Sequence, residues 1–297
     1  MAQTFPQPLI DLYNEYIHGG MSRRDFVDRI KIYAVGGLTT AAILEGLMPN
    51  YALGEVVPKN DSRLKTEYIT VPSPQGNEKI KGYFVRPASA AANAKLPGIL
   101  VVHENRGLNP HIEDIARRMG IANFMAFAPD GLTSVGGYPG DDDAGGRLFG
   151  QVDRNKMTED FVAAAYWLKN RADCTGKIGV TGFCYGGGIA NTLAVRMGAD
   201  LAAAAPFYGQ MPTNAADIAR IKAAILVHHG ATDARLAGAY PAYDTALKTA
   251  SVTHEGYIYE GAGHGFNNDA TPQRYNEAAS KLAMERTIAW FNKYVRG

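Results

Sequence analysis

The chain has 297 residues, of which 46% are hydrophobic and 20% are charged, enough for one sizeable core or at most two small ones. Lys+Arg 30 against Asp+Glu 29 leaves a net charge of +1, which argues against a nucleic-acid binder and an acidic disordered regulator. Cys174 and Cys184 cannot form a disulfide framework, and no apolar run of about 18 residues predicts a membrane span. We therefore expect a soluble enzyme or small-molecule binder, as a monomer or homodimer.

Residues 1–60 support two interpretations. The run Ser22-Arg23-Arg24-Asp25-Phe26-Val27 resembles a twin-arginine export signal, and a mildly apolar stretch from Ile32 to Leu44 follows it. The alternative is a pair of helices packed on the main domain. Apolar and aromatic residues recur there at helical spacing, namely Leu9, Leu12, Tyr13 and Tyr16. Gly19-Gly20 would end this first helix, and Ser22 could cap a second one. Packed helices predict a cytoplasmic protein, whereas a cleaved segment of about 52 residues predicts a periplasmic one.

Residues 61–297 are predicted to form one α/β domain. Glu67 to Val71 and Lys79 to Arg86 alternate polar and apolar residues, which predicts an edge hairpin. Further strands, several of them continuous apolar runs typical of buried strands, are expected at Gly98–Val102, Phe124–Ala128, Ile178–Val180, Ala202–Tyr208, Ala223–Val227 and His254–Tyr259. Helices are expected at Pro110–Met119, Thr158–Leu168 with Thr158 as cap, Ile189–Met197, Tyr240–Thr249 and Gln273–Tyr294. This alternation predicts a mostly parallel sheet between helices, with a long loop at Ser134–Gly150 over a site.

The sharpest motif is Gly182-Phe183-Cys184-Tyr185-Gly186-Gly187-Gly188, between a predicted strand and a predicted helix. It has the form of a nucleophile elbow with Cys in place of Ser. The glycines on either side of the nucleophile are needed at this strained turn, because a Cβ there would clash with adjacent strands. The alternatives are a glycine-rich turn with a small buried Cys, or a phosphate-binding loop. A phosphate loop needs a Lys and a Ser or Thr after the glycines, and Gly188-Ile189-Ala190 provides neither.

Two later residues complete a candidate triad. Asp233 follows the strand predicted at Ala223–Val227, and His264 lies in a glycine-rich loop after the next strand. Taken singly, Asp233 could cap a helix and His264 could be a solvated loop residue. Their order after Cys184 is nevertheless that of α/β-hydrolases, in which the acid orients the His that activates the nucleophile.

The run His103-Glu104-Asn105-Arg106-Gly107 directly follows a predicted buried strand. In an α/β-hydrolase, this loop supplies one oxyanion-hole N–H, here that of Asn105, and the residue after the nucleophile, Tyr185, supplies the other. Glu104 is either an exposed loop residue or a carboxylate placed near Cys184.

These motifs together resemble the dienelactone hydrolase (carboxymethylenebutenolidase) family over roughly residues 60–297. The resemblance implies Cys184 as nucleophile, His264 as general base and later acid, Asp233 as the residue that orients His264, and Glu104 as a switch that promotes the thiolate. The sequence departs from the namesake enzymes at Asn268, where they carry an arginine for the substrate carboxylate. Arg106, Arg147 and Arg154 are candidate replacements or ordinary surface arginines. Candidate pocket aromatics, which could equally be packing residues, are Tyr138, Phe149, Tyr185, Tyr208 and Phe266.

The sequence thus predicts an α/β-hydrolase that cleaves an ester or lactone through an acyl-cysteine intermediate. It suggests no cofactor and no metal, because the seven His are scattered and no H-E-x-x-H or C-x-x-C motif occurs. Three alternatives remain open. They are a non-catalytic binding protein on the same scaffold, a nucleotide or flavin binder that uses the glycine-rich turn, and a hydrolase acting on thioesters or organophosphates.

Overall fold

The fold centres on a mixed eight-stranded sheet with the strand order β1-β2-β4-β3-β5-β6-β7-β8. The computed structural model describes residues 5–91 and 93–297. The strands are β1 Leu64–Ser73, β2 Glu78–Pro87, β3 Leu96–Val102, β4 Met125–Pro129, β5 Cys174–Phe183, β6 Ala203–Phe207, β7 Ala224–Gly230 and β8 His254–Tyr259. β1 pairs antiparallel with β2, and β2 with β4, whereas the remaining neighbours are parallel. The predicted edge hairpin and the predicted parallel sheet are both confirmed.

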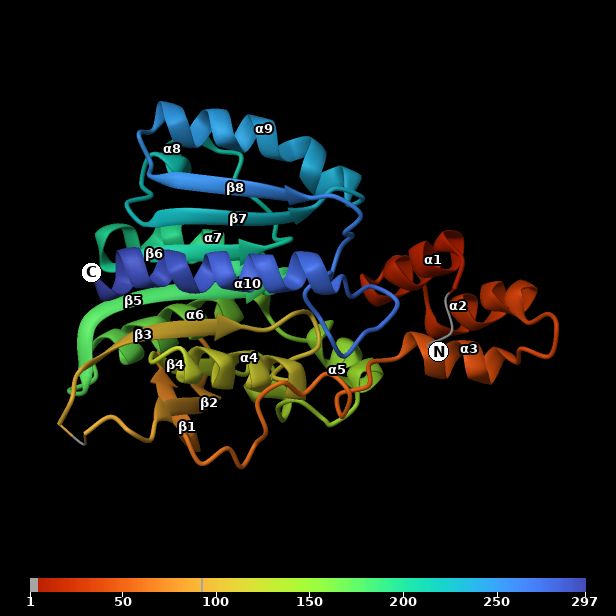
Figure 1. Cartoon of the computed structure of the whole chain (residues 1–297), viewed down its shortest axis with the longest axis horizontal. Coiled ribbons are helices and arrows are strands. Elements are labelled where there is room, and N and C mark those ends of the chain that lie inside the picture. The colour runs from red at the N-terminus through yellow and green to blue at the C-terminus, as the bar shows by residue number, and fades with distance from the viewer. Residues whose placement is uncertain (1–4, 92) are drawn as a thin grey trace.

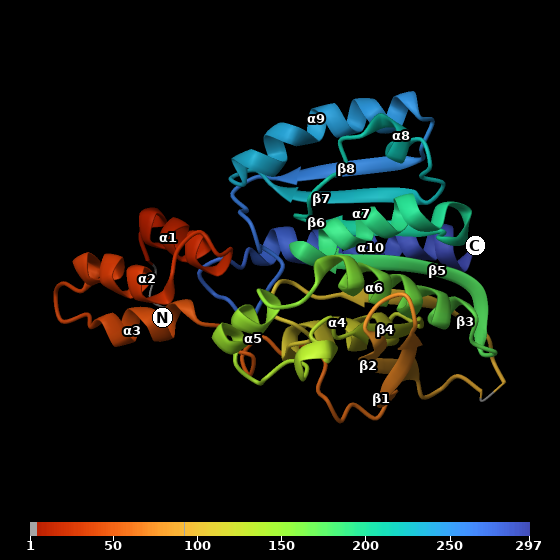
Figure 2. The ribbon, with the colours of Figure 1, turned by 180° about the vertical axis from the view of Figure 1, so that it is seen from behind.

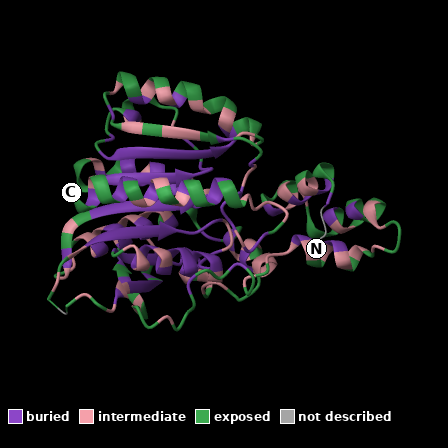
Figure 3. Ribbon diagram, viewed as in Figure 1, coloured by how far each residue is buried: buried purple, intermediate pink, exposed green. Residues whose placement is uncertain are grey.

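Helices cover both faces of this sheet. α4 and α10 lie in front in Figure 1, and α6 and α7 lie in front when the molecule is turned around in Figure 2. The helices of this part are α4 Pro110–Ile121, α5 Asp142–Phe149, α6 Arg154–Lys169, α7 Tyr185–Met197, α8 Ala215–Ile218, α9 Ala234–Thr249 and α10 Glu277–Phe291. The central strands are buried almost throughout (Figure 3), as continuous apolar runs require.

Several helix boundaries differ from the predictions, in part because polar caps, rather than apolar periodicity, decide where helices begin. α6 begins at Arg154 because the Asp153 carboxylate accepts from two first-turn N–H groups, so Thr158 lies inside the helix. α9 begins at Ala234, capped by Asp233. The predicted loop Ser134–Gly150 contains α5, whose first turn the Asp141 side chain caps. The closing helix is also shorter than predicted, because a wider turn over Asn292–Arg296 follows Phe291.

The N-terminal part forms three helices, α1 Gln7–Ile17, α2 Arg23–Ile30 and α3 Thr40–Leu47. Their inward residues share a small apolar cluster of their own that includes Leu9, Tyr13, Phe26 and Ile43. Ser22 caps α2 through the Asp25 N–H. These helices lie beyond the carboxyl ends of the parallel strands (Figure 1), where this fold places its binding sites. In the described ranges, no helix has the length and hydrophobicity needed to cross a bilayer.

Candidate active site

The carboxyl ends of β5 and β7 and the loop after β8 bring together Cys184, Asp233 and His264. Cys184 follows the last residue of β5 and is the N-cap of α7. Asp233 lies three residues after β7, and His264 lies five residues after β8. Parallel strands end at the same edge of the sheet, which is why residues separated by up to 80 positions meet there.

The turn that carries Cys184 is strained and closely packed. Cys184 adopts a φ of 54°, a conformation that residues with a Cβ rarely take. A Cβ on Gly182 would lie 2.1 Å from the Gly186 carbonyl oxygen, and one on Gly186 would lie 2.3 Å from the Val102 oxygen. The strand, the turn and the helix can therefore approach one another only with glycine at these positions.

Alanine substitutions at two adjacent glycines should have opposite effects on stability. A Cβ at Gly187 would lie 2.5 Å from the Phe207 carbonyl oxygen, whereas one at Gly188 meets nothing closer than 3.6 Å. We expect Gly187→Ala to lower the free energy of unfolding by about 2 to 3 kcal/mol through overpacking against the backbone. Gly188→Ala should raise it by about 0.5 kcal/mol through lower unfolded-state entropy. Chemical denaturation of both variants checks this, and equal destabilisation would contradict it.

Asp233 makes both contacts that its sequence position suggested. One carboxylate oxygen accepts from the Leu236 N–H at 3.3 Å and caps α9, and the other lies 2.7 Å from His264 Nδ1. His264 Nε2 is buried and has no hydrogen-bond partner among the described residues. A bond from Nδ1–H to the carboxylate fixes the tautomer that leaves the Nε2 lone pair free to take a proton.

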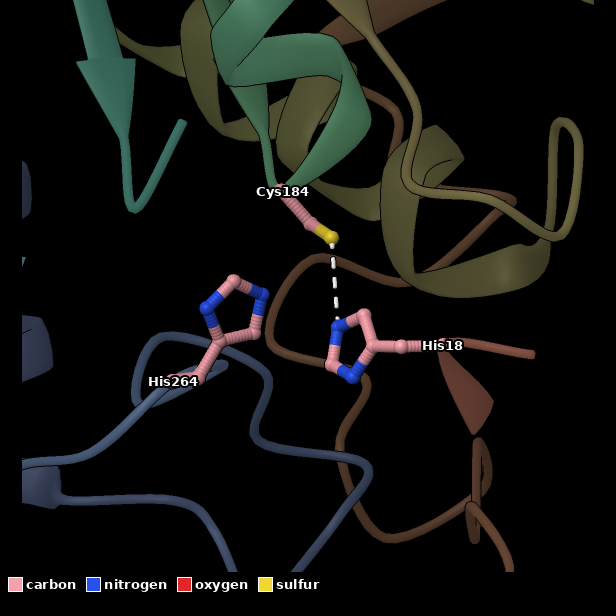
Figure 4. A group of neighbouring side chains, drawn as sticks. All are labelled: His18, Cys184 and His264. Carbon is pink, nitrogen blue, oxygen red and sulfur yellow. Dashed lines mark hydrogen bonds between the residues drawn. The ribbon is translucent and has the colours of Figure 1, made fainter. Parts of the chain in front are cut away.

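His18, at the end of α1, is a site residue that the sequence did not suggest. Its Nε2 lies 3.6 Å from Cys184 Sγ, and its ring makes an edge contact with His264 at 4.7 Å between centroids (Figure 4). The Ile17 carbonyl anchors this helix end by accepting from Asn105 Nδ2 at 2.7 Å and from Arg106 at 3.1 Å. The last carbonyls of a helix lack internal donors, so these bonds hold His18 over Cys184.

The charges of the site favour a thiolate–imidazolium pair. Burial alone would raise the pKa of the Cys184 thiol, but the His264 charge and the hydrogen bond with His18 outweigh it and lower that pKa to about 6. Burial alone would lower the pKa of His264, but Cys184 and Asp233 outweigh it and raise that pKa to about 9. Burial raises the pKa of Cys174, and the Gly176 N–H bond and the Arg171 and Lys169 charges do not outweigh it. The pKa values of the two thiols are therefore shifted in opposite directions.

Glu104 is neither exposed nor hydrogen-bonded to Cys184 in this structure. It is buried, and its carboxylate accepts from Asn268 Nδ2 at 3.1 Å. Asn268, the position at which the sequence lacks the expected arginine, therefore holds Glu104 in place. Glu104, Asn105 and Cys184 line the same small recess of about 20 Å³. The predicted oxyanion residues Asn105 and Tyr185 both line the larger cavity beside Cys184.

A cavity of about 590 Å³ lies between α1, α5 and Cys184. Its lining includes five arginines and, among the described lining residues, a single acid, Asp143; the arginines are Arg23, Arg106, Arg147, Arg154 and Arg235. Asp143 binds Arg23 Nε at 3.0 Å and the Tyr16 hydroxyl at 2.7 Å. Four arginines therefore face the cavity without a carboxylate partner in its described lining. The sequence suggested Arg106, Arg147 and Arg154, but not Arg23 or Arg235.

The predicted pocket aromatics divide into two groups. Phe149, Tyr185 and Tyr208 line the cavity, and Arg154 lies 3.6 Å above the Phe149 ring centroid. Tyr138 and Phe266 are corrections, because neither is in the described lining. The Tyr138 hydroxyl donates to Asp142 at 2.9 Å, which turns it toward α5. Phe266 is fully buried against the Phe207, Tyr208 and Tyr259 rings and is a packing residue.

Comparisons with known proteins agree with this geometry. The profile of the "Dienelactone hydrolase family" matches residues 80–295, and that of a "YqhI-like" family matches residues 1–31. "Putative carboxymethylenebutenolidase" of Salmonella typhimurium is 31% identical over 79% of this chain and 89% of its own length. "Putative hydrolase fragment YghX" of Escherichia coli is 53% identical over 39% of this chain and 97% of its own length.

A solved structure supports the same assignment. The crystal structure of a "Putative Dienelactone Hydrolase" from Klebsiella pneumoniae superposes with a TM-score of 0.66 at 27% identity, covering 77% of this chain and all of that one. The matched family profile spans the elbow, the acid and the His loop. The chain therefore belongs to the dienelactone hydrolase family and is a carboxylic ester or lactone hydrolase with the α/β-hydrolase fold.

Proposed function

We propose that the protein hydrolyses a carboxylic ester or lactone through a Cys184–His264–Asp233 triad and an acyl-cysteine intermediate. The observation that supports this proposal is that Asp233, His264 and Cys184 lie next to one another in a row. The Asp233 carboxylate lies 2.7 Å from His264 Nδ1, and His264 Nε2 and Cys184 Sγ lie within 4.8 Å of each other. A nucleophile, a base and an orienting acid in this spatial arrangement perform acyl transfer on unrelated folds.

Acylation starts from the thiolate–imidazolium pair. Cys184 Sγ attacks the acyl carbon, and the negative charge moves to the carbonyl oxygen. The N–H groups of Tyr185 and Asn105 would stabilise this oxyanion, each contributing about 3 kcal/mol. The Tyr185 N–H lies in the first turn of α7, where helix geometry leaves amides without internal acceptors. His264 then donates its Nε2 proton to the leaving alkoxide as the C–O bond breaks.

Deacylation uses the neutral His264 that acylation leaves behind. Its Nε2 takes a proton from water, the resulting hydroxide attacks the thioester carbon, and the acid leaves as Cys184 regains its thiolate. Glu104 would act earlier, by promoting the Cys184 thiolate before acylation, since its carboxylate is held by Asn268 beside the same recess as the nucleophile. For a lactone, the alcohol and the acid stay in one molecule and leave together.

The cavity favours a substrate that carries its own carboxylate. Arg106 and Arg235 have acidic neighbours behind the lining, Asp142 and Asp233. Arg147 and Arg154 form no ion pair with a described residue, so these two arginines add positive charge to the cavity. Guanidinium groups bind carboxylates through two parallel hydrogen bonds. The apolar surface of Phe149 and Tyr208 suits the hydrocarbon part of the substrate between its carboxylate and its ester group. Open-chain esters and lactones that carry a free carboxylate therefore fit this cavity better than neutral esters.

A matched substrate pair tests this function. We expect p-nitrophenyl acetate, mono-p-nitrophenyl succinate and the lactone dihydrocoumarin all to be hydrolysed. The value of kcat/KM should be about 10-fold higher for the succinate than for the acetate, because the succinate carboxylate gains one charge-assisted hydrogen bond. Arg147→Gln should reduce that preference, whereas Arg63→Gln, at an exposed site near β1, should not. Folded protein that hydrolyses none of the three would overturn the proposed function. Equal rates on the two nitrophenyl esters would overturn only the substrate class.

A further inference from the structure

Three possible metal ligands converge at the nucleophile from three distant parts of the chain. Cys184 Sγ, His264 Nε2 and His18 Nε2 all lie within 4.8 Å of one another, and the sulfur is 3.6 Å from His18 Nε2. Figure 4 shows the sulfur facing the space between the two rings. In a tetrahedral zinc site, bond lengths of about 2.3 Å to sulfur and 2.0 Å to nitrogen place these ligand atoms about 3.5 Å apart. The Cys184 sulfur and His18 Nε2 already have this separation. Side-chain rotations that move His264 Nε2 by about 1 Å would bring it to the same distance from the other two atoms.

Hydrogen bonds away from the site aim both imidazoles correctly. His18 Nδ1 lies 2.6 Å from the Asn14 carbonyl oxygen, and His264 Nδ1 lies 2.7 Å from the Asp233 carboxylate. In the neutral form of each ring, which is the form that binds a metal, Nδ1 carries the proton and the Nε2 lone pair faces the sulfur. A carbonyl or carboxylate behind each ligating His is the usual outer arrangement of protein zinc sites.

The surroundings also suit a bound ion. His18 is exposed and borders the large cavity, so a path from solvent reaches the three atoms. His264 Nε2 is buried and has no hydrogen-bond partner in the described part of the chain, a cost that a metal bond would remove. Three protein ligands with cavity on the fourth side leave one position for water.

We propose that Cys184, His264 and His18 form a binding site for a zinc-type divalent cation, which blocks the hydrolase while it is bound. The ion forms bonds to Sγ and to both Nε2 atoms, and the one proton shared by Cys184 and His264 leaves to solvent. The sulfur lone pair and the His264 lone pair are then both occupied, so neither attack nor proton transfer can occur. The N-terminal helices thereby contribute the third ligand of a site on the hydrolase domain.

Cobalt spectroscopy tests the site independently of turnover. The full chain, reduced and freed of metal, should bind one Co²⁺ with a thiolate-to-cobalt charge-transfer absorption and the strong visible bands of a tetrahedral ion, and one Zn²⁺ should displace it. We expect His18→Ala to weaken Zn²⁺ binding at least about 100-fold, since even outer residues of such sites contribute 10- to 100-fold. His254→Ala is the matched control, because His254 also bonds a backbone carbonyl and a carboxylate but lies on β8.

The two cysteines separate this site from adventitious binding. Cys184→Ala should lose the charge-transfer band, and Cys174→Ala, at the opposite end of β5, should keep it. Thermal melting of each variant confirms that it is folded, and His18→Gln provides a second variant of similar size. Unchanged Zn²⁺ affinity in both His18 variants, or a charge-transfer band that persists in Cys184→Ala, would overturn the proposal. Metal-loaded wild type that hydrolyses esters as fast as the metal-free enzyme would overturn the block.

Discussion

Replacing Cys184 with alanine is expected to lower kcat for ester hydrolysis by about 10⁴-fold or more. The reaction then has no nucleophile in the strained elbow, and only the oxyanion donors and substrate binding remain to accelerate attack by water. The fold should persist, because the sulfur is partly exposed and its removal leaves the elbow glycines in place. Intact-mass spectrometry after brief exposure to p-nitrophenyl acetate should show one acetyl group on the wild-type chain and none on Cys184→Ala.

The second cysteine provides an internal control for this experiment. Cys174 is buried, and burial raises its pKa, so it should stay unacylated, and Cys174→Ala should acylate like the wild type. Acylation of the wild type should be fastest between a pH of about 6, above which Cys184 is a thiolate, and about 9, below which His264 is an acid. An adduct on another residue, or unchanged turnover in a clean preparation of Cys184→Ala, would contradict the acyl-cysteine mechanism.

Replacing Asp233 with asparagine is expected to lower kcat by about 10³- to 10⁴-fold with little loss of stability. An amide in place of the carboxylate no longer stabilises the imidazolium and can hold the ring in the wrong tautomer. Asparagine caps helices as well as aspartate does, so α9 should keep its first turn. Because Asp233 helps to raise the pKa of His264, the upper limit of the pH profile should move to lower pH in this variant.

The alanine variant separates the two roles of Asp233. Asp233→Ala should lose activity to the same extent and, in addition, about 1 kcal/mol of the free energy of unfolding, because the cap at Leu236 N–H is lost. Steady-state kinetics and chemical denaturation of both variants measure these quantities side by side. Wild-type activity in Asp233→Asn would show that His264 needs no carboxylate partner.

Most of the hydrolase domain could be predicted from the sequence because its signals are local. Continuous apolar runs indicate strands buried on both faces, and the glycine spacing around Cys184 marks the turn. Of the contacts that require these glycines, the one between Gly182 and Gly186 is local, whereas Gly186 and Gly187 pack on the Val102 and Phe207 carbonyls. Asp233 was a candidate cap, but apolar periodicity placed the helix start at Tyr240 instead of Ala234. The helix start at Arg154 was missed because the capping carboxylate of Asp153 has no periodic pattern to reveal it. Asp141 and α5 escaped prediction for the same reason, since glycine-rich composition indicates a loop.

What the sequence by itself determined is the order of the reactive groups along the chain. Cys184, Asp233 and His264 each follow a recognisable strand, and parallel pairing must bring such positions to one edge. Only the tertiary structure decided what surrounds them. His18 is 166 residues from Cys184, and its place depends on how the Ile17 carbonyl docks on Asn105 and Arg106. Glu104 bonds Asn268, and Phe266 enters the core, because hydrogen-bond partners and packing depend on contacts across the whole fold.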